Sequence, residues 1–171
     1  MSQDLPLPLS HLVDVTSIRP DGLTISFDAN ETERLGLAKL FSIPAVNQLS
    51  AQFSLTRKGS RVKVKGVVSG VFTQTCVVTL DPFESSFHED IALDFDENPA
   101  PPRDDRPDDE SPDPIIDGKI DLGAVAAEFT ALALDPYPKK PGAVFEYRED
   151  EDEDDRAVSP FAALADLKKK S

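Results

Sequence analysis

The chain has 171 residues, a formal net charge of −14, one cysteine and two histidines. One cysteine excludes an intramolecular disulfide and a zinc site built from several thiolates, so a reducing cytoplasm is the expected location. There is no apolar run of about 18 residues, so no membrane-spanning helix is expected.

The negative charge is concentrated in two stretches. Residues 94–113 carry −7 and residues 148–156 carry −5, whereas residues 1–93 carry only −2. The part of the chain that is expected to fold is therefore close to neutral. For this reason the acidic pI of the whole chain, about 4.4, does not exclude contact between the folded surface and a nucleic acid.

The N-terminal part predicts a β-hairpin followed by a helix. Residues 11–18 are rich in β-branched side chains and residues 23–27 alternate apolar with polar, with a turn signal between the two runs. Asn30 is a suitable N-cap for a helix over residues 31–41. The apolar side chains of this helix that we expect to face the core are Leu37, Leu40 and Phe41.

The central part of the chain, residues 45–95, is rich in strands. A turn signal at residues 58–60 predicts that two strands meet there. The second strand is predicted over residues 61–80 and contains Gly66 and Gly70. Because glycine inside a strand pattern often marks an irregularity, we expect a bulge or bend there.

A second prediction of irregular structure concerns residues 96–114, which contain six prolines and no aliphatic residue larger than alanine. This composition predicts a disordered acidic loop. Residues 115–120 then predict a short strand, and Asp121 is a suitable N-cap for the following helix. The apolar side chains of that helix recur at helical spacing, at Leu122, Val125, Ala126, Phe129 and Leu132.

Residues 149–155 are consecutive acids, which predicts a solvated acidic linker over residues 148–158. A serine–proline pair opens residues 159–171, predicted as a short amphipathic helix with a basic tail. We expect a single domain over residues 1–147. Its predicted fold class is α+β: an antiparallel, twisted or barrel-like sheet with two or three helices and two disordered acidic segments.

Five basic residues surround the turn at residues 58–60. They are Arg57, Lys58, Arg61, Lys63 and Lys65. Because alternate side chains of a strand share a face, Arg61, Lys63 and Lys65 are expected to project together, and the two residues before the turn extend the cluster. The cluster predicts contact with nucleic-acid phosphates. The alternative is a solvated sheet face whose lysines discourage edge-to-edge pairing.

No catalytic constellation is evident. Cys76 lies in a β-branched run, which favours a buried and inert thiol. A nucleophilic cysteine needs a base, and only His88 falls on a plausible neighbouring strand. The sequence contains no phosphate-binding glycine loop, no Ser–His–Asp set and no metal-ligand cluster. We therefore expect a protein that is not an enzyme and has no catalytic residue, metal, cofactor or small-molecule substrate.

A proline-rich segment, residues 134–142, follows the predicted second helix. Its prolines stiffen an extended path. Tyr137, Lys139 and Lys140 within it predict a docking surface for RNA or protein. The alternative is a helix exit that packs Leu134 and Tyr137 onto the sheet.

Three motifs, at residues 75–82, 117–123 and 134–142, resemble the YceD family, most closely its alphaproteobacterial type. The residues that carry the resemblance include Cys76, Leu80, Asp81, Pro82, Asp121, Leu122, Glu128, Leu134, Pro136 and Pro138. Many members of the family have a second cysteine three residues after the first. Thr79 stands at that position here, so the resemblance does not imply a metal site in this chain.

The resemblance implies a cytoplasmic, non-enzymatic factor that supports accumulation of 23S rRNA and assembly of the large ribosomal subunit. The implied partner is 23S rRNA or its precursor, contacted through the basic hairpin, with Tyr137, Lys139 and Lys140 as a second contact. The alternative is an acidic chaperone that holds a basic large-subunit ribosomal protein on residues 149–155. No membrane partner is implied.

Overall fold

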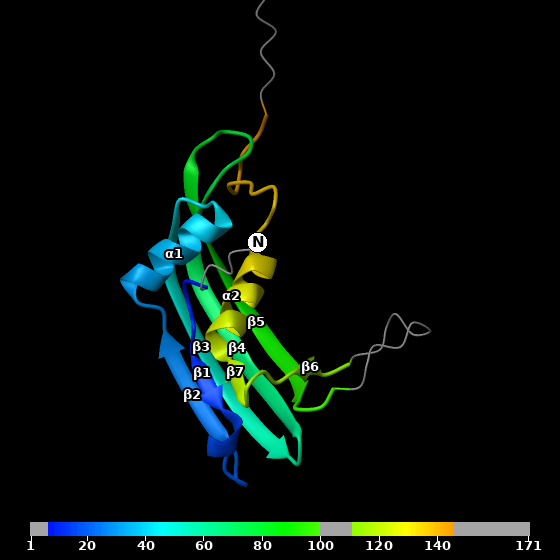
Figure 1. Ribbon diagram of the computed structural model, residues 1–171. Coiled ribbons are helices and arrows are strands. Elements are labelled where there is room, and N and C mark those ends of the chain that lie inside the picture. Colours follow the sequence, from blue (N-terminus) through cyan, green and yellow to red (C-terminus); the bar gives the residue numbers. More distant parts are fainter. Residues whose placement is uncertain (1–6, 100–110, 146–171) are drawn as a thin grey trace, which may run out of the picture.

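The computed structural model describes residues 7–99 and 111–145 (Figure 1). The central part of the predicted loop, residues 100–110, lies outside the described residues. The predicted acidic linker over residues 148–158 and the predicted C-terminal helix also lie outside them, so both stay predictions.

A five-stranded sheet forms the body of the protein, in the order β2–β3–β4–β5–β6. Its strands are β2 (Leu23–Asp28), β3 (Ala45–Lys58), β4 (Arg61–Thr75), β5 (Pro82–Asp96) and β6 (Asp113–Pro114). Neighbouring strands are antiparallel except for the short β6, which pairs parallel to β5. A separate two-stranded sheet pairs β1 (Leu12–Asp14) with β7 (Lys119–Asp121).

Both helices, α1 (Glu31–Phe41) and α2 (Leu122–Ala133), lie on the same face of the sheet as the β1–β7 pair (Figure 1). This inner face holds the apolar core, and its fully buried side chains on β3 and β4 include Phe53, Leu55, Val62, Val64 and Val68. The predicted α+β class, with a mostly antiparallel sheet, is confirmed. The sheet does not close into a barrel, because its order ends at β2 and β6.

The predicted hairpin between residues 11–18 and 23–27 is wrong. β1 ends at Asp14, and a 3₁₀ turn, η1 (Val15–Ser17), follows because the Asp14 carboxylate accepts a hydrogen bond from the Thr16 N–H at 2.8 Å. Hydrogen bonds from the Thr16 hydroxyl and N–H also hold the pKa of Asp14 below its usual range. The chain leaves the strand direction at this turn, so that β1 pairs with β7 and β2 pairs with β3.

Gly66 and Gly70 do not produce a bulge. The β3–β4 register is regular across both glycines, and its shift lies between Val46 and Gln48 instead. A Cβ atom on Gly66 would lie 2.2 Å from the carbonyl oxygen of Gln52. Glycine is required there because the neighbouring backbone lies too close for any side chain.

Two leucines predicted to face the core are exposed. Leu40 is 53% exposed and Leu132 is 73% exposed. Leu40 follows the buried Ala38 by two residues, and Leu132 follows the buried Thr130 by two. Two residues turn about 200° around the helix axis, so both leucines lie on the side of the helix opposite to these buried residues. Leu37 is fully buried, as predicted.

The predicted loop over residues 96–114 is ordered at both ends. Asp96 is the last residue of β5, and β6 lies in parallel beside that end. The predicted strand over residues 115–120 is shorter and begins later, as β7. Asp117 and Gly118 have positive φ angles of 51° and 70° and form the turn that precedes it.

Both predicted N-caps are confirmed, and Asp121 does more than cap α2. Its carboxylate accepts hydrogen bonds from the N–H groups of Gly123 (2.9 Å) and Ala124 (3.1 Å). It also accepts from the His11 N–H and the Ser10 hydroxyl, both at 2.7 Å. One side chain thus joins the start of α2 to the segment before β1.

We expect Asp121→Ala to lower the free energy of unfolding by about 2 kcal/mol or more, since it removes a cap and leaves the His11 N–H without its acceptor. Urea unfolding followed by circular dichroism measures the change. Asn30→Ala is the matched control, because it removes only the α1 capping box and should cost about 1 kcal/mol. Equal losses for the two variants would contradict the second role of Asp121.

Candidate nucleic-acid interface

The outer face of the β3–β4 hairpin carries four exposed cations, called here the outer-face cluster. They are Lys58, Arg61, Lys63 and Lys65. Lys58 lies opposite Arg61 across the turn. The alternate residues Val62 and Val64 are fully buried on the inner face, so the predicted alternation along β4 is confirmed.

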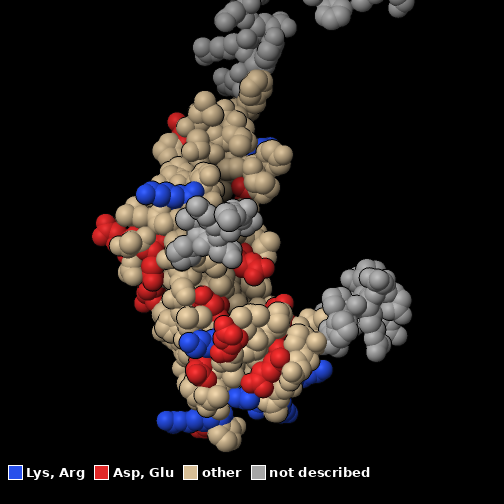
Figure 2. All heavy atoms as spheres, viewed as in Figure 1, with Lys and Arg blue, Asp and Glu red and all other residues tan. Residues whose placement is uncertain are grey.

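A hollow of about 340 Å³ opens on this face. It is lined by Thr56, Lys58, Arg61, Lys63, Asp94 and Pro112. An anionic group that enters the hollow would meet positive charge from both β3 and β4. Figure 2 shows Lys and Arg side chains gathered at the lower end of the molecule, where Figure 1 places the β3–β4 turn, with acidic side chains among them.

Two carboxylates of β5 partly neutralise the cluster. Arg61 forms an ion pair with Asp96 at 3.1 Å, and Lys63 forms one with Asp94 at 3.7 Å. Hydrogen bonds from the Asn98 N–H and the Ser60 hydroxyl, together with Arg61, hold the pKa of the buried Asp96 below its usual range.

Lys58 and Lys65 form no ion pair within the described residues. The positive charge of the cluster that remains available therefore comes mainly from these two lysines.

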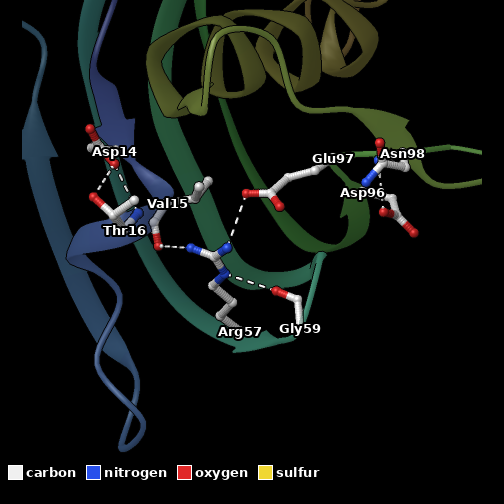
Figure 3. Close-up of polar contacts among 8 residues, drawn as sticks. All are labelled: Asp14, Val15, Thr16, Arg57, Gly59, Asp96, Glu97 and Asn98. Atoms are coloured by element: carbon white, nitrogen blue, oxygen red, sulfur yellow. Dashed lines mark hydrogen bonds and ion pairs between the residues drawn. The ribbon is translucent and has the colours of Figure 1, made fainter.

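Arg57 does not join the outer-face cluster as the sequence predicted. It lies opposite Val62, on the inner side of the hairpin. Its guanidinium donates to the carbonyl oxygens of Gly59 (2.9 Å) and Val15 (3.0 Å) and forms a 3.0 Å ion pair with Glu97 (Figure 3). The residue ties the hairpin to η1 and to the end of β5.

We expect Arg57→Ala to lower the free energy of unfolding by about 2 kcal/mol, because three acceptors lose a shared charged donor. Chemical unfolding of the purified protein measures the loss. Arg57→Lys should recover little of it, since an ammonium lacks the planar fork that reaches all three oxygens. Full recovery by lysine would show that only the charge matters.

The first and third family motifs, residues 75–82 and 134–142, pack against each other at the other end of β4; we call this contact the motif junction. Three interactions join them. They are the hydrogen bond from the Val77 N–H to the Pro138 carbonyl (2.9 Å), the hydrogen bond from the Lys140 N–H to Cys76 Sγ (3.4 Å), and the ion pair of Lys140 with Asp81 (3.9 Å).

Cys76 lies at the centre of the motif junction and is fully buried, as predicted. Hydrogen bonds from the Lys140 N–H and the Thr79 hydroxyl lower its pKa to about 7. His88 lies opposite Ser69, seven residues along β4 from Cys76, which is roughly 20 Å away at the usual strand rise. The histidine therefore cannot serve the thiol as a base.

Leu80 is a feature that sequence reasoning missed. The strand predicted over residues 61–80 ends at Thr75 in the structure. Leu80 lies in the loop that follows, where it takes a φ angle of 60° and its side chain is 76% exposed. Its N–H donates to the Cys76 carbonyl at 2.9 Å, which holds this unfavourable conformation in place. Nothing in a leucine signals a left-handed position; only the Asp-Pro pair that follows marks the loop.

The structure does not bring the two predicted contact regions together. Tyr137 is 72% exposed and Lys139 is exposed, but both lie at the motif junction, at the upper end of the sheet in Figure 1. The outer-face cluster lies toward the opposite end of β4, with Lys65 about 33 Å and Arg61 about 46 Å from Thr75 at the usual rise per residue. Lys140, the third predicted residue of this region, is engaged by Asp81.

Other residues that carry the family resemblance have mainly structural positions. Pro82 begins β5, Leu122 is fully buried at the start of α2, and Leu134 is the C-cap of α2. Glu128 and Pro136 are exposed.

We expect native Cys76 to react with a thiol reagent only slowly, at the rate at which the motif junction opens, although its pKa of about 7 favours the thiolate. Absorbance of the released thiolate of the reagent gives the rate. The same sample in urea is the control and should react completely. Rapid, complete labelling of the native protein would show an accessible nucleophile and would reopen the question of catalysis.

These features define the class of the protein: in the described residues, an α+β fold with both helices on one face of the sheet (Figure 1), a cationic hairpin at one end and a junction of two sequence motifs at the other. Residues 64–168 match the family model described as large ribosomal RNA subunit accumulation protein YceD. The chain belongs to the YceD family. No curated protein and no solved structure matches it.

Family membership connects the protein with accumulation of the large ribosomal RNA subunit, and the family is not one of known enzymes. In the described ranges, no helix is long and apolar enough to cross a membrane. The same residues contain no group of three or more side chains suited to hold a metal ion.

Proposed function

We propose that the protein is a non-enzymatic ribosome-biogenesis factor of the cytoplasm that contacts 23S rRNA, or its precursor, through the outer-face cluster. The observation that carries the proposal is the hollow on the outer face of the β3–β4 hairpin, which is lined by Lys58, Arg61 and Lys63. Family membership supplies the class of RNA.

The geometry favours contact with the RNA backbone. The residues that line the hollow include no aromatic side chain, so there is no platform on which a base would stack. Lysine and arginine at this position would bind phosphate oxygens and position the RNA without reading its sequence. Asp94 is exposed and its ion pair with Lys63 is worth at most about 1 kcal/mol, so a phosphate can displace it at small cost.

The motif junction is proposed as a second contact, through exposed Tyr137 and Lys139. A duplex or folded RNA that reached both ends of the sheet would span most of the length of β4. Contact at two separated points would orient the protein on the RNA, which a single basic patch does not do.

We expect the double variant Lys58→Ser with Lys65→Ser to bind 23S rRNA fragments more weakly at low salt. In a plot of the logarithm of affinity against the logarithm of salt concentration, the slope should become shallower by about 2. Each lost phosphate contact changes the slope by about 1. Fluorescence anisotropy of labelled fragments over a salt series measures both quantities.

The matched control is Lys39→Ser with Lys119→Ser. It changes the net charge equally, but both lysines are exposed on α1 and β7, away from the hollow. Equal weakening by the two double variants would mean that only net charge matters and would contradict a site on the hairpin. If the unchanged protein fails to bind RNA at low salt, the proposal is wrong, and a basic ribosomal protein held by residues 149–155 becomes the function to test.

A further inference from the structure

A second hollow, of about 670 Å³, lies on the inner face between α2 and the end of β5. We call it the α2 groove. Its apolar lining includes Leu12, Ile116, Leu93 and Phe129. Leu12 is 61% exposed and Ile116 is 64% exposed, which is unusual for large aliphatic side chains on the covered side of a sheet.

The rim of the α2 groove is acidic. Asp113, Asp117 and Glu128 are all exposed along it, and among the described residues of the lining only Lys119 is basic. Asp121 also borders the groove, but its carboxylate is occupied by the cap of α2. A segment that fills the groove should therefore combine an apolar face with positive charge.

Such a segment exists in the same chain. We infer that residues 159–167 dock into the α2 groove as an amphipathic helix, with Lys168–Lys170 over its acidic rim. The large apolar side chains of this segment are Phe161, Leu164 and Leu167. Their spacing of three residues places them along one side of a helix.

Two observations support this segment as the occupant. The family model matches as far as residue 168, so the segment belongs to the same family unit as the sheet and α2. The connecting residues 146–158 are also long enough. Thirteen residues span up to about 45 Å, and the groove residues Leu93 and Phe95 lie about 36 to 43 Å from the motif-junction end of β4 at the usual rise per residue. The inference does not depend on the proposed contact with RNA.

The first test is a double-mutant cycle in the full-length protein. We expect Ile116→Asp and Leu164→Asp each to lower the melting temperature by about 4 °C, and the double variant to melt close to the lower single variant, because both remove the same contact. Leu132→Asp is the matched control: it is 73% exposed on α2 but does not line the groove, and should melt like the unchanged protein.

Additive effects, or no effect of Leu164→Asp, would overturn the inference. Ile116 and Leu132 are both exposed, so neither Ile116→Asp nor Leu132→Asp should prevent folding.

The second test measures proximity. A spin label on Lys170→Cys, in a Cys76→Ser background, should broaden the amide signals of Ile116 and Phe129 in the ¹⁵N-labelled protein. A mixture of spin-labelled protein without ¹⁵N and ¹⁵N-labelled protein without the spin label should show no broadening. Broadening in the mixture would mean that a second copy fills the groove, and its absence from both samples would mean that residues 159–170 stay away from it; either result overturns docking within one chain.

Discussion

The two-residue turn at Gly59 and Ser60 fixes the register of β3 against β4, and the rest of the structure depends on that register. Gly59 takes a φ angle of 63°, which residues with a side chain adopt only at a cost. With this turn, Val62 points into the core and Lys63 points to solvent. A shift by one residue would exchange the two faces, burying lysines and exposing valines. The core and the cationic face therefore have the same origin.

The sequence predicted the local features that depend on one residue type. Asn30 and Asp121 cap their helices, and Cys76 is buried, because each follows from hydrogen-bonding capacity or hydrophobicity within a few residues. The failures at β1 and Arg57 came from long-range pairing. The sequence contains nothing that directs β1 to β7, about a hundred residues away, or that turns Arg57 toward the carbonyl of Val15.

The family match covers the cationic hairpin only in part, because Lys65 is the one residue of the outer-face cluster within residues 64–168. The match begins at Val64, so it includes the motif junction, β5 and α2 but leaves out Lys58, Arg61 and Lys63. The proposal of RNA contact by the hairpin therefore rests on the geometry of this protein, and the family supplies the process in which it acts.

The free edge of β5 has a consequence for aggregation. β6 covers that edge only beside Phe95 and Asp96, and along the rest of the strand no other described strand pairs with it. An uncovered edge offers its backbone N–H and C=O groups as a template for a strand from another molecule. Glu84, Glu89 and Asp90 are exposed along β5. Their like charges repel the same edge of a neighbouring molecule, so part of the acidity of this protein protects it from templated aggregation.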